Sequence, residues 1–269
     1  MEVKIEDDFD LVKIAASGQC FRMRQIENHA GYEVISKSHV LHILEKSPRI
    51  FSIDATQEDW KTFWIPYFDL TRNYEKLQAG VPKGDFLEKA AKFSRGIRIL
   101  KQDPFETLIT FILSQRKSIP AIRAAVERLA RAYGKEIDEE LYAFPTPIDL
   151  ARANEDKLRA EKLGYRAPYV LDAAKRVVEG KLDLVAAEKF DDRMLLEKLM
   201  EVKGVGIKVA TCVALFAYAR FALAPIDTWM EKIIQQRYKG ENPFVRFGNA
   251  AGILQQYAFF YAIMHKDEF

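Results

Sequence analysis

The sequence predicts an α+β fold that is mainly helical, with a small antiparallel β subdomain at the N-terminus. Short β-branched or alternating segments separated by polar turns are confined to about residues 1–80. From residue 83 onward, apolar residues recur at helical spacing in one segment after another. Glycine and proline stand between these segments. A chain of 269 residues is long enough for two or three subdomains around a real core.

The N-terminal part contains two clear strand signals. Tyr32–Ile35 and His39–Leu44 are rich in apolar and β-branched residues and are separated by polar turn residues, so we expect an antiparallel pair. The segment Ser17–Arg22, with the sequence SGQCFR, precedes them. From its residues alone this segment reads as the start of a strand with a turn glycine, Gly18.

The helical part is punctuated by Gly134, Pro145, Pro147, Gly164 and Gly180. Apolar residues at helical spacing between these breakers predict seven helices before residue 201. They are Phe86–Phe93, Pro104–Ser114, Ile119–Tyr133, Pro147–Ala153, Glu155–Leu163, Pro168–Glu179 and Asp191–Met200. A last helix, Ala250–Tyr261, contains several aromatic residues and reads as part of the core.

The stretch Leu199–Ile234 carries the strongest motif. An amphipathic helix ends near Val202, and Gly204 and Gly206 flank Val205 in a pattern typical of a tight turn whose backbone amides point outward. A buried helix then runs from Lys208 to near Arg220. A further helix begins at Thr228, with Asp227 in the position of an N-cap residue.

Lys208 and Asp227 are the candidate reactive residues of this stretch. The positive end of a helix dipole disfavours an ammonium, and apolar surroundings act in the same direction, so Lys208 is a candidate neutral nucleophile. Asp227 follows one helix and one loop later, so the chain can return its carboxylate to the amine. The alternative from spacing alone is a solvated lysine and an ordinary N-cap aspartate.

Composition excludes several classes of protein. The chain has 41 Lys and Arg against 39 Asp and Glu, a net charge of +2, so any basic surface for DNA must be concentrated on one face. Cys20 and Cys212 are its two cysteines, which excludes an iron–sulfur cluster held by four cysteines and gives no metal-ligand spacing. Neither a secretory signal nor a membrane-spanning apolar run is present, so we expect a cytoplasmic protein in a reducing compartment.

The sequence Gly-Val-Gly-x-Lys-Val-Ala followed by Pro-Ile-Asp resembles the helix-hairpin-helix (HhH-GPD) signature of base-excision DNA glycosylases. Together with SGQCFR, it is most similar to the 8-oxoguanine DNA glycosylase/AP lyase subfamily. The resemblance implies a two-lobed helical body behind the β subdomain. It places the β subdomain at 1–82, one lobe at 83–110 plus 235–269, and the other at 111–234, which includes the helix-hairpin-helix near 195–220.

The resemblance also assigns roles to residues. It implies that Lys208 is the nucleophile of a glycosylase/lyase, that Asp227 is essential, and that the amides of Gly204, Val205 and Gly206 contact a DNA phosphate. The implied base pocket has four members. The carbonyl of Gly18 accepts the N7 hydrogen that 8-oxoguanine has and guanine lacks, Gln255 reads the Watson–Crick edge, and Phe259 and Cys212 cover the two faces of the base.

Two loops correspond to the segments that enter the DNA stack in this family. Tyr165 is expected to press into the stack from the minor groove, and Arg166 to reach the orphaned base. The alternative for Tyr165 is a half-buried tyrosine beside a helix C-cap glycine. The other loop lies within residues 111–119 and contains Arg116. In this region the chain departs from the family, because Arg116 replaces an asparagine and Ala121 replaces an arginine that contacts the orphaned cytosine. Trp229, a position where some members have histidine, is a further departure.

The resulting prediction is a bifunctional base-excision-repair enzyme that flips 8-oxoguanine out of duplex DNA, excises it and cleaves the strand by β-elimination through a lysine Schiff base. The resemblance also implies a nucleoid-associated protein, and we expect a monomer without a redox cofactor or an iron–sulfur cluster. A structural monovalent cation at the hairpin is compatible with the pattern. Two alternatives stay open at this point: a helix-hairpin-helix glycosylase for alkylated purines, and a non-catalytic helix-hairpin-helix DNA-binding protein.

Overall fold

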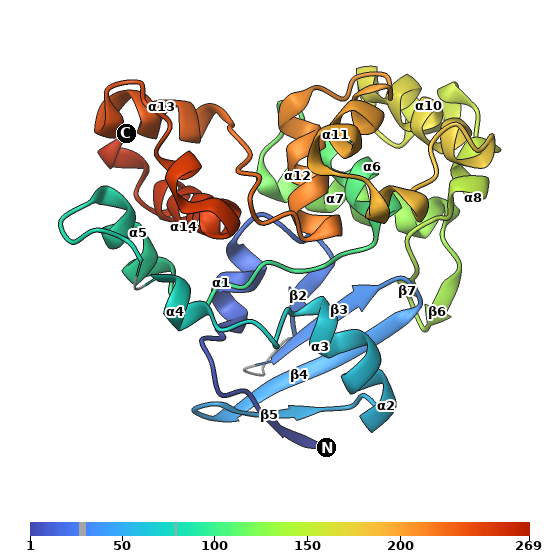
Figure 1. Ribbon diagram of the computed structural model, residues 1–269. Helices are drawn as coiled ribbons and strands as arrows, with labels where there is room; N and C mark the ends of the chain where they lie inside the picture. Colours follow the sequence, from blue (N-terminus) through green and yellow to red (C-terminus); the bar gives the residue numbers. More distant parts are fainter. Residues whose placement is uncertain (27–30, 79) are drawn as a thin grey trace. The chain divides into compact units, whose positions relative to one another are not determined.

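An antiparallel sheet of five strands forms the first part of the chain in a computed structural model that describes residues 1–26, 31–78 and 80–269 (Figure 1). The strand order is β1-β5-β4-β3-β2, with Glu2 opposite Ser52 and Met23 opposite Val34. The strands are β1 Glu2–Lys4, β2 Met23–Gln25, β3 Gly31–Ser36, β4 His39–Ser47 and β5 Ile50–Ile53. The antiparallel pair expected at Tyr32–Ile35 and His39–Leu44 is therefore confirmed, within a larger sheet.

Helices close one side of this sheet. Ile14 from α1 and Trp64 from the turn that follows α2 are buried in one cluster with Val34, Leu41 and Phe51 from the strands. The elements concerned are α1 Leu11–Ala16, α2 Gln57–Asp59, the π-helical turn η1 Trp60–Trp64, α3 Ile65–Tyr67 and α4 Tyr74–Gln78. The sheet therefore has its own apolar core.

The chain forms two compact units. The first contains residues 1–34, 41–101 and 219–269, and the second contains residues 35–40 and 102–218. Besides the sheet, the first unit holds α5 Phe86–Ser94, α13 Thr228–Tyr238, η4 Pro243–Ala250, α14 Ala251–Met264 and η5 Lys266–Glu268. In this unit α14 packs against α5, η4 and α13.

Residues 102–218 of the second unit are mainly helical, with a short hairpin formed by β6 Glu136–Asp138 and β7 Leu141–Tyr142. Within it, α12 packs on α6 and α11, and α10 packs on α8 and α6. Its helices are α6 Pro104–Ser114, α7 Ile119–Tyr133, α8 Pro147–Ala151, α9 Glu155–Ala160, η2 Gly164–Arg166, α10 Ala167–Val178, η3 Ala186–Lys189, α11 Asp192–Met200 and α12 Ile207–Tyr218. The mainly helical fold with an N-terminal sheet is thus confirmed.

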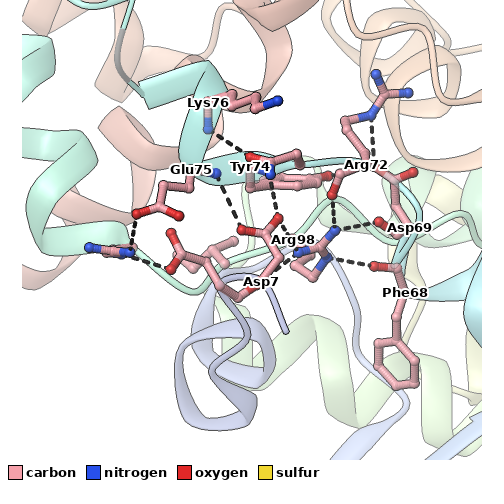
Figure 2. A network of polar contacts seen from close by, with 12 residues as sticks. Asp7, Phe68, Asp69, Arg72, Tyr74, Glu75, Lys76 and Arg98 are labelled. Carbon is pink, nitrogen blue, oxygen red and sulfur yellow. Dashed lines mark hydrogen bonds and ion pairs between the residues drawn. The ribbon is translucent and has the colours of Figure 1, made fainter. Parts of the chain in front are cut away.

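A buried arginine holds the first unit together at the junction of its N-terminal segment and the chain around Phe68–Arg72 (Figure 2). The guanidinium of Arg98 is fully buried and donates to the carbonyls of Phe68 (3.0 Å), Asp8 (2.8 Å), Arg72 (2.7 Å) and Asp69. It also pairs with the Asp7 carboxylate at 3.1 Å. A buried charge is tolerated only when its donors are satisfied. These bonds therefore hold the segments at Asp7–Asp8 and Phe68–Arg72 against Arg98.

Candidate active site

The predicted hairpin lies between α11 and α12, so the helix-hairpin-helix is confirmed. Gly204 has a φ of +80°, and a Cβ at this position would lie 2.3 Å from the ring of Tyr169, so only glycine fits the turn. The Val205 N–H donates to the Val202 carbonyl at 3.0 Å. This amide therefore helps to close the turn, and the expected contact of the Gly204, Val205 and Gly206 amides with a DNA phosphate stays a prediction.

Neighbouring helices hold the hairpin from two sides. On α10, the Asp172 carboxylate accepts the Lys203 N–H at 2.8 Å and is itself held by Arg176 at 3.0 Å. At the end of α6, the Gln115 Nε2 donates to the Gly204 carbonyl at 3.1 Å. The position of the residues that follow the turn, including the first turn of α12, is thus set by α6 and α10.

Lys208 lies in the first turn of α12 and is half-buried. Its Nζ is 5.4 Å from the ring centroid of Phe111, a buried residue of α6 that stacks on Phe216. Within the described residues, no carboxylate forms an ion pair with Lys208. Cys212, one turn further along α12, is 3% exposed. The lysine amine therefore lies over an aromatic ring of its own unit, one turn before a buried thiol.

Asp227 is the N-cap of α13, as expected. Its Oδ1 accepts the N–H groups of Trp229 and Met230, each at 3.0 Å. The residue is half-buried. Lys208 belongs to the second unit and Asp227 to the first. The pairing of the two side chains stays a prediction.

The loop that follows α6 carries concentrated positive charge. Arg116 is exposed and has a φ of +52°, a left-handed conformation that costs a non-glycine residue about 1–2 kcal/mol. Burial, together with the charges of Arg166 and Arg128, lowers the pKa of Lys117. Lys117 was not singled out from the sequence, although a Lys beside an Arg in a loop is a recognisable signal. A loop of this charge suits a phosphate backbone.

Tyr165 and Arg166 of η2 lie beside this loop. Tyr165 is 46% exposed, in agreement with the expected surface aromatic, and its hydroxyl donates to the Gln115 carbonyl at 3.4 Å. Arg166 is only 7% exposed. Its Nε donates to the same carbonyl at 3.0 Å, and its guanidinium lies 4.3 Å from the Tyr165 ring. The expected contact of Arg166 with the orphaned base stays a prediction.

The structure brings the candidate pocket residues of the first unit together. Gly18 follows α1 with a φ of +75°. Gln255 and Phe259 lie one turn apart on α14, the former 4% exposed and the latter half-buried. Gln256, next to Gln255, donates from Nε2 to the Ser17 carbonyl at 2.6 Å, so the Ser17–Gly18 segment lies against the middle of α14.

One polar atom in this region lacks a partner. Among the described residues, Gln255 Oε1 is buried and accepts no hydrogen bond. Leaving a buried acceptor unpaired costs about 1–3 kcal/mol, so native proteins rarely retain one without a use for it. The Gln255 amide is therefore available to a ligand that brings its own donor.

The described parts of the chain contain neither a metal-ligand cluster nor a membrane-spanning helix. In residues 1–26, 31–78 and 80–269, no group of three or more His, Cys, Asp or Glu side chains is arranged to hold a metal ion. Over the same residues, no helix combines the length and apolar character needed to cross a bilayer.

Comparison with known protein families gave two matches that together cover nearly the whole chain. Residues 2–108 match the N-terminal domain of 8-oxoguanine DNA glycosylase. Residues 109–243 match the HhH-GPD superfamily of base excision DNA repair proteins.

Among curated relatives, an N-glycosylase/DNA lyase of Saccharomyces cerevisiae is 32% identical over 204 residues, covering 69% of this chain and 53% of the yeast protein. A probable N-glycosylase/DNA lyase of Methanothermobacter thermautotrophicus is 30% identical over 201 residues, covering 63% of this chain and 64% of the relative. The chain thus spans about half to two thirds of the length of these curated relatives.

Solved structures match over almost the full length. The Clostridium acetobutylicum 8-oxoguanine glycosylase/lyase, in complex with duplex DNA containing cytosine opposite 8-oxoguanine, has a TM-score of 0.91 and 32% identity, covering 99% of this chain and 98% of that one. MBOgg1, in complex with a low-affinity DNA ligand, has a TM-score of 0.93 and 32% identity, covering 98% and 96%. A 3-methyladenine DNA glycosylase from Archaeoglobus fulgidus, at 17% identity and a TM-score of 0.75, shares the fold.

Proposed function

The chain belongs to the HhH-GPD superfamily of base excision DNA repair proteins, and we propose that it excises 8-oxoguanine from duplex DNA and then cleaves the strand at the resulting site. The expected partner is duplex DNA containing 8-oxoguanine, bound by one copy of the chain. The observation that carries the proposal is Lys208, a half-buried amine in the first turn after the hairpin, resting on the Phe111 ring without a carboxylate partner among the described residues.

The chemistry follows from an amine in that position. Nζ of Lys208 forms a bond to C1′ of the sugar as the N-glycosidic bond breaks, and the base leaves with the bonding electron pair. Loss of the amine proton and opening of the sugar give an imine to C1′. Removal of a C2′ proton then expels the 3′ phosphate. Asp227 either accepts the amine proton or stabilises the positive charge that develops on the sugar.

Recognition of the base requires contacts that are specific to the lesion. Shape alone distinguishes 8-oxoguanine poorly, because guanine differs from it by one oxygen and one hydrogen. The Gly18 carbonyl pairs with the N7 hydrogen of the lesion, and guanine leaves that acceptor unpaired at a cost of about 1–3 kcal/mol, or roughly ten- to a hundredfold in selectivity. Gln255 reads the Watson–Crick edge, with Phe259 and Cys212 against the faces of the base.

The direct test is single-turnover excision from labelled duplexes that contain 8-oxoguanine, a 3-methyladenine-type lesion or uracil. We expect cleavage of the 8-oxoguanine duplex alone. Preferred release of the alkylated base would instead assign the chain to the alkylpurine glycosylases, whose fold it shares. Binding of all duplexes without base release would indicate a non-catalytic helix-hairpin-helix protein.

A second experiment tests the pocket. We expect Gln255→Ala and Phe259→Ala to lower 8-oxoguanine excision far more than they lower the yield of folded protein, because both side chains contact the base rather than only filling the core. Gln235→Ala, an exposed position on α13, is the matched control. Loss of folding with normal specific activity in the remaining protein would show that both residues serve only as core.

A further inference from the structure

Gln256 is one of two adjacent buried amides in the middle of α14. Its side chain is 3% exposed, and its Nε2 donates to the Ser17 carbonyl at 2.6 Å, a bond between residues 239 positions apart. Burying an amide without partners is costly, so a buried amide that keeps such a bond constrains its partner strongly. The constrained partner is the peptide that precedes Gly18.

Both flanks of that peptide are fixed by other bonds of the first unit. The Ser17 hydroxyl donates to the Ile14 carbonyl at 2.7 Å and accepts from the Gln19 Nε2 at 2.9 Å. The Gln19 amide also donates to the Arg98 carbonyl at 2.8 Å and accepts the Leu100 N–H at 2.9 Å. The flanks are thus tied to α1 and to residues 98–100, whereas the Ser17 carbonyl itself is tied to α14.

Planarity of the peptide bond transmits this constraint to Gly18. The Ser17 carbonyl and the Gly18 N–H lie in one plane, so holding the oxygen fixes the orientation of the whole unit. Gly18 has a φ of +75°, a left-handed conformation that glycine adopts readily because it has no Cβ. Its own side chain therefore does not restrict rotation of the backbone. The direction of the Gly18 carbonyl therefore depends on the bonds that hold its neighbours.

Gln255 and Gln256 divide two tasks between them. Adjacent residues on a helix point about 100° apart, so the two amides face different directions. Gln256 is engaged with Ser17, while the Oε1 of Gln255 is buried without a partner among the described residues. One amide is therefore built into the protein, and the other is left for a ligand.

We propose that Gln256 is a positioning residue for base discrimination. It holds the Ser17–Gly18 peptide at a fixed place along α14. The Gly18 carbonyl and the Gln255 amide then face the base at a fixed distance and orientation to each other. The inference rests on the proposed excision of 8-oxoguanine. Removal of the Gln256 donor frees the peptide to rotate, which displaces the acceptor for the N7 hydrogen. Cleavage at an abasic site, where no base is present, does not require this acceptor.

The test compares two reactions of the same preparation: single-turnover excision from an 8-oxoguanine duplex, and cleavage of a duplex with an abasic site. Gln256→Met keeps the length of the side chain and removes the donor. We expect this variant to lose at least tenfold in excision while abasic-site cleavage stays within about twofold of wild type. Gln235→Met, exposed on α13, should leave both reactions unchanged.

Gln256→Glu provides an independent readout. An ionised carboxylate repels the Ser17 carbonyl, whereas a protonated one donates to it. The ratio of excision to abasic-site cleavage should therefore rise as the pH falls toward 5 in this variant and stay flat in the wild-type protein. This ratio is also decisive if Gln256→Met does not fold.

Equal loss of both reactions, or no loss of either, would overturn the positioning role. A wild-type protein that cleaves abasic sites but does not excise 8-oxoguanine would overturn the proposed substrate itself, and this inference with it.

Discussion

Replacement of Arg98 by methionine should be among the most destabilising single changes in the first unit. The substitution keeps an unbranched side chain but removes every donor of a fully buried guanidinium. The carbonyls of Phe68, Asp8 and Arg72 and the Asp7 carboxylate lose their bonds together. Removing one partner of a buried charged network costs about 3–5 kcal/mol, a large share of a typical total of about 5–15 kcal/mol.

The size of the effect can be checked by thermal and urea unfolding. At about 2–4 °C per kcal/mol for a chain of this size, the melting temperature should fall by roughly 6–20 °C. Arg95→Met is the matched control, because Arg95 pairs with Asp8 and Glu75 near the surface, where an ion pair contributes about 0–1 kcal/mol. An Arg98→Met protein as stable as Arg95→Met would refute the reasoning.

Three further predictions concern the hairpin, the sheet and the opposite base. Gly204→Ala should lower the unfolding free energy by about 1–3 kcal/mol, because its φ of +80° and the Tyr169 ring both exclude a Cβ; a variant as stable as wild type in urea would contradict this. Burial lowers the pKa of His42, but its bonds to Asp54 and Glu33 outweigh this and leave it raised. Its contribution to stability should therefore be full below about pH 6.5 and lost as the pH rises through the folded pKa, so His42→Asn should make the unfolding free energy less pH-dependent than in wild type; identical profiles would contradict this. Excision opposite adenine, guanine or thymine should lie within about tenfold of that opposite cytosine, a difference of ~1.4 kcal/mol, since Ala121 replaces one arginine; a thousandfold cytosine preference in single-turnover assays would show that Arg116 restores the contact.

The elements that the sequence predicts well are those with local causes. The segment Pro104–Ser114 forms α6 with the predicted bounds. Its causes are local: apolar periodicity, a proline in the first turn, and the N-cap residue Asp103 directly before it. Asp227 likewise caps α13 as its position predicts. These signals act over a few residues, so they can be read without knowledge of the fold.

The features that the sequence does not reveal depend on distant partners. The strand Glu2–Lys4 is only three residues long and exists because it pairs with residues near Ser52. The burial of Arg166 depends on the Gln115 carbonyl, which lies 51 residues earlier in the sequence. Gln256 donates to the Ser17 carbonyl, 239 residues earlier. A buried arginine or glutamine looks like a surface residue until the carbonyl that it serves is known.

The pocket predictions fall between these cases. The resemblance that selects Gly18, Gln255 and Phe259 does not specify how the first is brought to the other two. The structure supplies that link through the bond from Gln256. For Lys208, it supplies the aromatic floor of Phe111.

The central claim is that Lys208 is the nucleophile, and borohydride trapping during reaction with an 8-oxoguanine duplex tests it most directly. A reducing agent converts a lysine imine into a stable amine, so the wild-type protein should form a covalent adduct with the DNA, and peptide mapping should locate it at Lys208. Lys203→Gln, a change at an exposed lysine of the same hairpin, should still be trapped, whereas Lys208→Gln should give no adduct. An adduct of undiminished yield in Lys208→Gln would show that another amine performs the reaction.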